Sequence, residues 1–100
     1  MAEGQPERAL ATLQNALRLA QNHKNQKIEA GILSKLGSIY AKQQQPEVTR
    51  EWYEKALKIQ QITGDRENEV GTLLSLAKLS SQKPAVARRY LAQATVRTIS

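Results

Sequence analysis

The feature that most constrains this chain is an internal repeat, because the sequence resembles itself at an offset of 40 residues. The register includes residues that interrupt helices: Gln-Pro-Glu occurs at 5–7 and again at 45–47, and Gly31 aligns with Gly71. A period of 20–50 residues is the signature of a repeat array, in which each unit buries its apolar face on its neighbours. Other identical pairs keep the same register: Ala16-Leu17 with Ala56-Leu57, Glu29 with Glu69, Leu33 with Leu73 and Leu36 with Leu76.

The repeated units are expected to be helical. Ala, Leu, Gln, Lys, Arg and Glu are strong helix formers, and aromatic residues make up only 4% of the 100 residues. Apolar residues recur at three- and four-residue spacing, as in the face formed by Ile32, Leu33, Leu36, Ile39 and Tyr40. No segment alternates apolar and polar residues over a useful length, so we expect no strand.

Proline, glycine and short polar residues mark the ends of these helices. Pro6, Pro46 and Pro84 each suit the first turn of a helix. Gly64 followed by Asp65 indicates a helix end and then an N-cap, and the segment 24–26 (Lys-Asn-Gln) is a weaker equivalent. We therefore predict helices over 6–23, 27–43, 46–63, 66–82 and 84–98.

The middle of the chain carries a more specific pattern. A Leu-Gly pair at 36–37 is followed by Tyr40, and the next predicted helix carries Tyr53, Ala56 and Leu57. These residues resemble the tetratricopeptide repeat. The 40-residue spacing and the junction after Thr63 are similar to the longer repeats of the kinesin light chain type. The following unit departs from the pattern in its first helix but keeps it in the second, as Ala87, Leu91 and Ala94.

The resemblance implies an all-α fold in which antiparallel helix pairs stack as a short right-handed solenoid of about two and a half repeats. We expect a single domain over residues 1–100, made of a half repeat at 5–24 and repeats at 26–63 and 65–98. The chain begins and ends on a second helix that lacks an obvious cap. We therefore expect either a piece of a longer protein or a homodimer formed through the uncapped terminal helices.

Several classes of function are not expected. The chain has no Cys, which leaves no disulfide, thiolate zinc site or cysteine nucleophile, and His23 is its only histidine. No Gly-rich phosphate loop or metal-ligand spacing occurs, so we predict no enzyme, no cofactor and no metal. No apolar run approaches the roughly 20 residues of a membrane span. The first six residues lack the features of a signal peptide, and we expect a cytoplasmic protein.

The resemblance implies a binding role. In such proteins the first helix of each pair lines a concave groove that receives a peptide or helix of a partner. We therefore predict a protein–protein interaction scaffold whose lysines favour an acidic partner segment. The alternative is that these positions are simply solvated. The predicted groove residues are Gly31, Ser34, Lys35, Ser38, Lys42, Gly71, Leu74, Ser75, Lys78 and Gln82.

The net charge of +6 leaves a second function open. Arg88, Arg89 and Arg97 lie on the last predicted helix, and no acidic residue follows Glu69. A basic surface of this kind could bind the phosphates of a nucleic acid. Aromatic residues for base stacking are scarce, however, so we expect a protein partner ahead of a nucleic acid.

Overall fold

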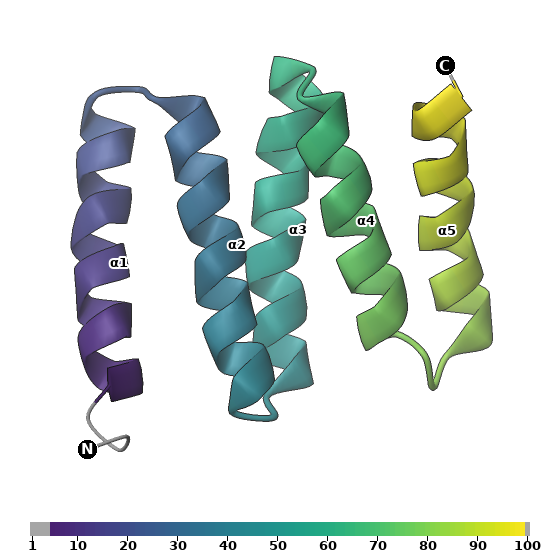
Figure 1. Cartoon of the computed structure of the whole chain (residues 1–100), viewed down its shortest axis with the longest axis horizontal. Coiled ribbons are helices and arrows are strands. Elements are labelled where there is room, and N and C mark those ends of the chain that lie inside the picture. The colour runs from purple at the N-terminus through teal and green to yellow at the C-terminus, as the bar shows by residue number, and fades with distance from the viewer. Residues whose placement is uncertain (1–4, 100) are drawn as a thin grey trace.

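The computed structural model describes residues 5–99, which form five α-helices in a single row (Figure 1). Each helix runs antiparallel to the one before it, giving a flat stack of 40 × 33 × 16 Å. Consecutive helices pack on one another, which confirms the all-α fold of about two and a half repeats. The domain prediction includes residues 1–4 and 100, which lie outside the described residues. The helices are α1 (Gln5–Asn22), α2 (Gln26–Lys42), α3 (Pro46–Thr63), α4 (Arg66–Leu79) and α5 (Pro84–Ile99).

The first three loops repeat one backbone geometry at intervals of 20 residues. Lys24, Gln44 and Gly64 adopt left-handed conformations, with φ of 55°, 58° and 72°. One residue further on, the backbone N–H donates to the carbonyl five residues back, in the Schellman arrangement that satisfies a free carbonyl at a helix end. These bonds join residue 25 to 20, 45 to 40 and 65 to 60, at 2.9, 3.0 and 2.9 Å.

The residue after each left-handed position is the N-cap of the next helix. The Asn25 side chain accepts a hydrogen bond from the Ile28 N–H at 3.3 Å, and the Asp65 side chain accepts one from the Asn68 N–H at 3.4 Å. Both bonds satisfy donors that a helix start leaves free, and both predicted caps are confirmed. Gln45 provides no such side-chain bond to α3.

The fourth loop differs, and the predicted end of the fourth helix at residue 82 is wrong. Helix α4 ends at Leu79, where the Ser80 N–H donates to the carbonyls of Leu76 and Ala77 at 3.0 and 3.1 Å. The Lys83 N–H then donates to the Ser80 carbonyl at 2.8 Å and turns the chain. Pro84 starts α5, and a residue before proline is disfavoured in a helical conformation. Gln82 is therefore a loop residue.

Helix α3 lies between two apolar cores. On one side, Ile32 and Leu36 of α2 pack with Ala20 of α1 and with Trp52 of α3. On the other side, Leu57 of α3 packs with Leu73 and Leu76 of α4 and with Ala94 of α5. Leu36, Leu73 and Leu76 are completely buried. The predicted apolar faces of the second and third helices are confirmed by this arrangement.

Gly37 explains how closely α2 and α3 approach. A Cβ atom at this position would lie 2.8 Å from both Cδ1 and Cε1 of Tyr53, closer than such atoms can pack. The Tyr53 ring therefore occupies the space that any larger residue would need. The Tyr53 hydroxyl lies 3.2 Å from the Ser38 hydroxyl, which links the same two helices at their surface.

Candidate functional site

The largest group of predicted groove residues lines one hollow between α2 and α4, which we call the α2–α4 hollow. Its volume is about 410 Å³, and α3 contributes Tyr53 and Gln60 to it. Gly31, Ser34 and Ser38 line it from α2, and Gly71 and Ser75 line it from α4. Its other lining residues are Lys27, Ala30, Asp65, Asn68 and Thr72.

The two glycines leave the backbone of this hollow accessible. A Cβ atom added at Gly31 or Gly71 would meet no atom within 4 Å, in contrast to one at Gly37. Both positions are exposed and lie inside regular helices. A ligand could therefore approach either helix backbone closely at these points.

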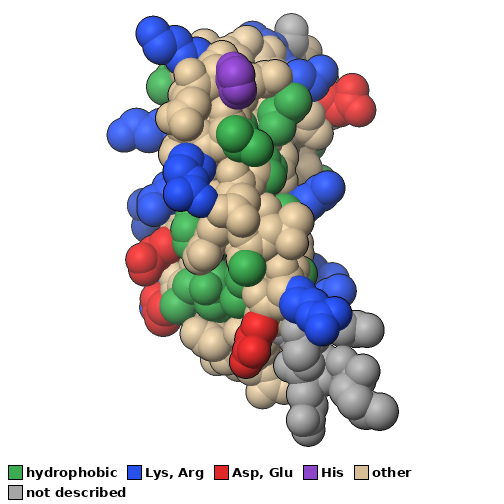
Figure 2. Space-filling model, turned by 90° about the vertical axis from the view of Figure 1, so that its left-hand side faces the viewer, with side chains coloured by type: hydrophobic (Ala, Val, Ile, Leu, Met, Phe, Trp, Pro, Cys, Tyr) green, Lys and Arg blue, Asp and Glu red, His purple; other side chains and the backbone are tan. Residues whose placement is uncertain are grey.

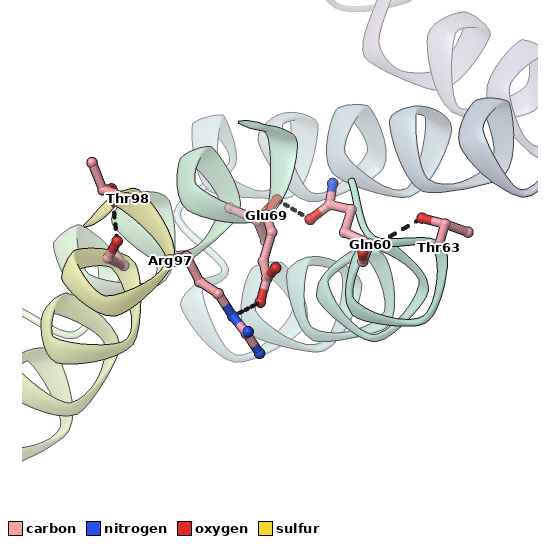
Figure 3. Close-up of polar contacts among 7 residues, drawn as sticks. Gln60, Thr63, Glu69, Arg97 and Thr98 are labelled. Carbon is pink, nitrogen blue, oxygen red and sulfur yellow. Dashed lines mark hydrogen bonds and ion pairs between the residues drawn. The ribbon is translucent and has the colours of Figure 1, made fainter. Parts of the chain in front are cut away.

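The wall of the hollow is held by a polar contact between helices. The Thr72 hydroxyl of α4 donates to the side-chain oxygen of Gln60 of α3 at 2.7 Å, and both residues are buried (Figure 3). Such a buried, paired contact fixes side-chain orientation, because breaking it would leave polar atoms unsatisfied. The α3 and α4 walls are thus tied together beneath the surface.

The charged residues of the hollow differ from those that the sequence suggested. Lys27, in the first turn of α2, lines it, and so does Asp65, whose carboxylate caps α4 and accepts a 2.8 Å bond from the Asn68 side chain. Lys35, Lys42 and Leu74 are exposed but lie outside the lining. Consecutive helical residues point about 100° apart, so a stripe drawn one position away selects a different lysine.

Two further groove predictions fall in other cavities. Lys78 lines an adjoining hollow of about 450 Å³, which shares Tyr53 and Ser75 with the α2–α4 hollow. Gln82 was predicted to continue the face of the fourth helix, but it lies in the α4–α5 loop. There it lines a separate cavity with Pro46 and Arg50.

The arginines of α5 do not form one free basic surface. The Nε atom of Arg97 donates to Glu69 at 2.9 Å, and the Glu69 side chain is only 3% exposed (Figure 3). Arg97 is thus used to pair a buried carboxylate of α4. Arg88 and Arg89 are exposed.

The two terminal helices expose apolar side chains. Leu19 on α1 and Leu91, Val96 and Ile99 on α5 are between 45% and 80% exposed. Figure 2 views the molecule from the α1 end, where hydrophobic side chains reach the surface between Lys and Arg. These faces suit contact with another helix, and the homodimer stays a prediction.

Metal-ligand and membrane features were sought in the same residues. Within residues 5–99, no three His, Asp or Glu side chains gather closely enough to hold a metal ion. No helix in this range combines the length and the apolar character needed to cross a membrane.

Comparison with known proteins assigns the middle of the chain. Residues 30–63 match the family model described as Tetratricopeptide repeat, which spans most of α2 and all of α3. No curated protein and no solved structure matches the chain. The kinesin light chain type of repeat stays a prediction. With the matched segment set in a stack of antiparallel helices, the chain is a tetratricopeptide repeat protein.

Proposed function

We propose that the α2–α4 hollow binds a peptide or helix of a partner protein and that the chain acts as an interaction scaffold. Tetratricopeptide repeats generally mediate protein–protein interactions, which supports a protein as the ligand. The observation that carries the proposal is the pair of exposed glycines, because Gly31 and Gly71 leave open space in the hollow. Catalysis is not part of this proposal, and the cytoplasmic location stays a prediction.

The lining suits a segment that forms hydrogen bonds. Ser34, Ser38, Asn68 and Ser75 offer hydroxyl and amide groups, while the charged lining residues are Lys27 and Asp65. Because the Asp65 carboxylate already caps α4, Lys27 is the charge better placed to contact a ligand. We propose that an acidic side chain of the partner lies near Lys27, with Lys78 in the adjoining hollow and the exposed Lys35 and Lys42 adding long-range attraction.

The experiment fills the hollow without damaging the fold. Gln is introduced at both Gly31 and Gly71, where its side chain has room and where replacing glycine also favours the helix. A natural partner is first isolated with the wild-type chain, and its binding segment is then measured by calorimetry. We expect the double variant to bind about tenfold or more weakly, a loss of at least about 1.4 kcal/mol, while its melting temperature does not fall.

A matched control separates this effect from a general one. Ala11→Gln adds the same side chain at an exposed position of α1, away from the hollow, and should bind like wild type. Equal binding by the wild type and the Gly31→Gln/Gly71→Gln protein would contradict the proposed site. Unchanged binding after Lys27→Glu and Lys78→Glu would contradict the acidic character of the partner while leaving the site in place.

The nucleic-acid alternative has a separate test. It predicts retention of RNA or DNA at low salt that is lost on Arg88→Ala/Arg89→Ala, because both arginines are exposed. Absence of retention by the wild-type chain removes this alternative. Arg97 is not included, because its substitution would leave the buried Glu69 unpaired.

A further inference from the structure

A second cavity lies at the edge of the stack where α3 begins and α4 ends. It has a volume of about 230 Å³ and shares no lining residue with the α2–α4 hollow. It is formed by the first turns of α3 and by the loop from α4 to α5, at the lower edge of the view in Figure 1. Its lining residues are Pro46, Glu47, Arg50, Leu79, Ser80, Ser81, Gln82 and Lys83.

Two buried donors at this cavity have no partner within residues 5–99. Ser80 is only 2% exposed, and its hydroxyl makes no hydrogen bond. The Nε atom of Arg50 is buried and also makes none. Buried polar groups are nearly always hydrogen-bonded, so two such atoms on the wall of one cavity indicate a ligand that accepts hydrogen bonds.

The charges around these donors select the sign of the ligand. Arg50 and Lys83 bring two positive charges to the cavity. The first turn of α3, an 18-residue helix, also faces it, and the N-cap Gln45 provides no side-chain bond to that turn. The amino end of a helix attracts anions, because its free N–H groups and its dipole point outward.

Glu47 is the opposing charge in this cavity. Its carboxylate accepts a 3.0 Å bond from NH1 of Arg50, and its side chain is 76% exposed. A pair this exposed is weak, so an anion can compete with Glu47 for the arginine. The Nε atom of Arg50 is not used by Glu47.

We propose that this cavity binds a phosphate-class oxyanion. The Ser80 hydroxyl and the Arg50 guanidinium donate hydrogen bonds to its oxygens, and Lys83 adds charge at the rim. A tetrahedral ion accepts bonds from several directions at once, which matches donors that come from a helix and a loop. The anion would join the start of α3 to the α4–α5 loop, and this proposal is independent of partner binding in the α2–α4 hollow.

The test is a titration of the whole chain with inorganic phosphate, followed by amide NMR at constant ionic strength set with chloride. We expect saturable shifts at Glu47, Ser81 and Lys83. Ser80→Ala should weaken binding by about tenfold, because a hydrogen bond to a charged group is lost. Lys83→Gln should also weaken it, and Glu47→Gln should strengthen it by removing the competing carboxylate. Lys58→Gln, at an exposed position of α3 outside the cavity, is the matched control and should change nothing.

Stability measurements distinguish a ligand site from a packing defect. Without phosphate, Ser80→Ala should not destabilise the chain, because it removes a buried hydroxyl that has no partner. Ser80→Ala binding phosphate as tightly as wild type, or the absence of saturable shifts in wild type, would overturn the proposal. A parallel titration with glycerol phosphate identifies the source of the anion. Tighter binding than that of inorganic phosphate assigns the site to phosphate esters, and weaker binding assigns it to the free ion.

Discussion

The two complete helix pairs solve one packing problem with different chemistry. In the α2–α3 pair, the Tyr53 ring lies against the bare backbone of Gly37. In the α4–α5 pair, Ala77 occupies the position 40 residues after Gly37, and polar contacts supplement the apolar core. Arg97 pairs with the buried Glu69, and the Tyr90 hydroxyl donates to Glu54 of α3 at 2.5 Å. The family pattern describes the contact between ring and glycine, which is why its match ends with α3.

The largest expected effect tests whether both pairs share one type of core. Leu36 and Leu76 are equivalent in the repeat and are both completely buried. Replacing either with Ala removes apolar contacts and leaves a cavity, so each variant should lose about 2–5 kcal/mol of unfolding free energy. Urea denaturation measures both losses. A loss for Leu76→Ala that is less than half of that for Leu36→Ala would show that polar contacts, rather than the core, stabilise α4–α5.

An intermediate effect tests the contact between ring and glycine. Gly37→Ala gains about 1 kcal/mol of helix propensity but places Cβ against Tyr53, an overpacking that typically costs about 1–3 kcal/mol. We expect a net loss of about 1 kcal/mol, whereas Gly31→Ala, which has open space, should gain about 1 kcal/mol.

A double-mutant cycle isolates the cause of the Gly37 effect. In a Tyr53→Leu background the ring is absent, so Gly37→Ala should no longer destabilise the chain. The same loss in both backgrounds would contradict the steric explanation. Thermal unfolding of the four proteins provides the comparison.

The smallest effect concerns pH and tests the polar side of the comparison. Burial, together with the hydrogen bond to Glu54, raises the pKa of Tyr90 from 10.0 to about 12. The folded chain therefore favours the protonated phenol. The resulting stabilisation is complete below pH 10 and is lost as the pH rises through 12. Between these values, wild type should lose more unfolding free energy than Tyr90→Phe. An equal pH slope for the two proteins would contradict the prediction, and Glu54→Gln should give an intermediate slope.

Most of the fold could be predicted because its signals are local or periodic. The 40-residue register, Gly64 and Asp65 located the helices to within a few residues, apart from the end of α4. Lys24 and Gln44 were not expected to be left-handed, because this conformation is uncommon outside glycine. Their role follows from the 20-residue spacing of the loops, which the two halves of each repeat contain.

The candidate sites were less predictable, because they depend on contacts between distant segments. Arg97 and Glu69 are 28 residues apart, and no local pattern pairs them. The choice of Lys27 rather than Lys35 depends on how α2 is rotated toward α4, which a stripe on one helix does not define. The cavity at Ser80 exists because α4 ends early. A helix continued to residue 82 would have removed it.

The equal steps at Lys24, Gln44 and Gly64 have a consequence for protein engineering. Each step returns the chain to an equivalent backbone geometry after 20 residues, and two steps span one helix pair. Residues 25–64 therefore form a module that starts at an N-cap and ends at a left-handed residue, so copies can be joined directly without a designed linker. In such an array, each added module contributes its own stability and one further interface with its neighbour.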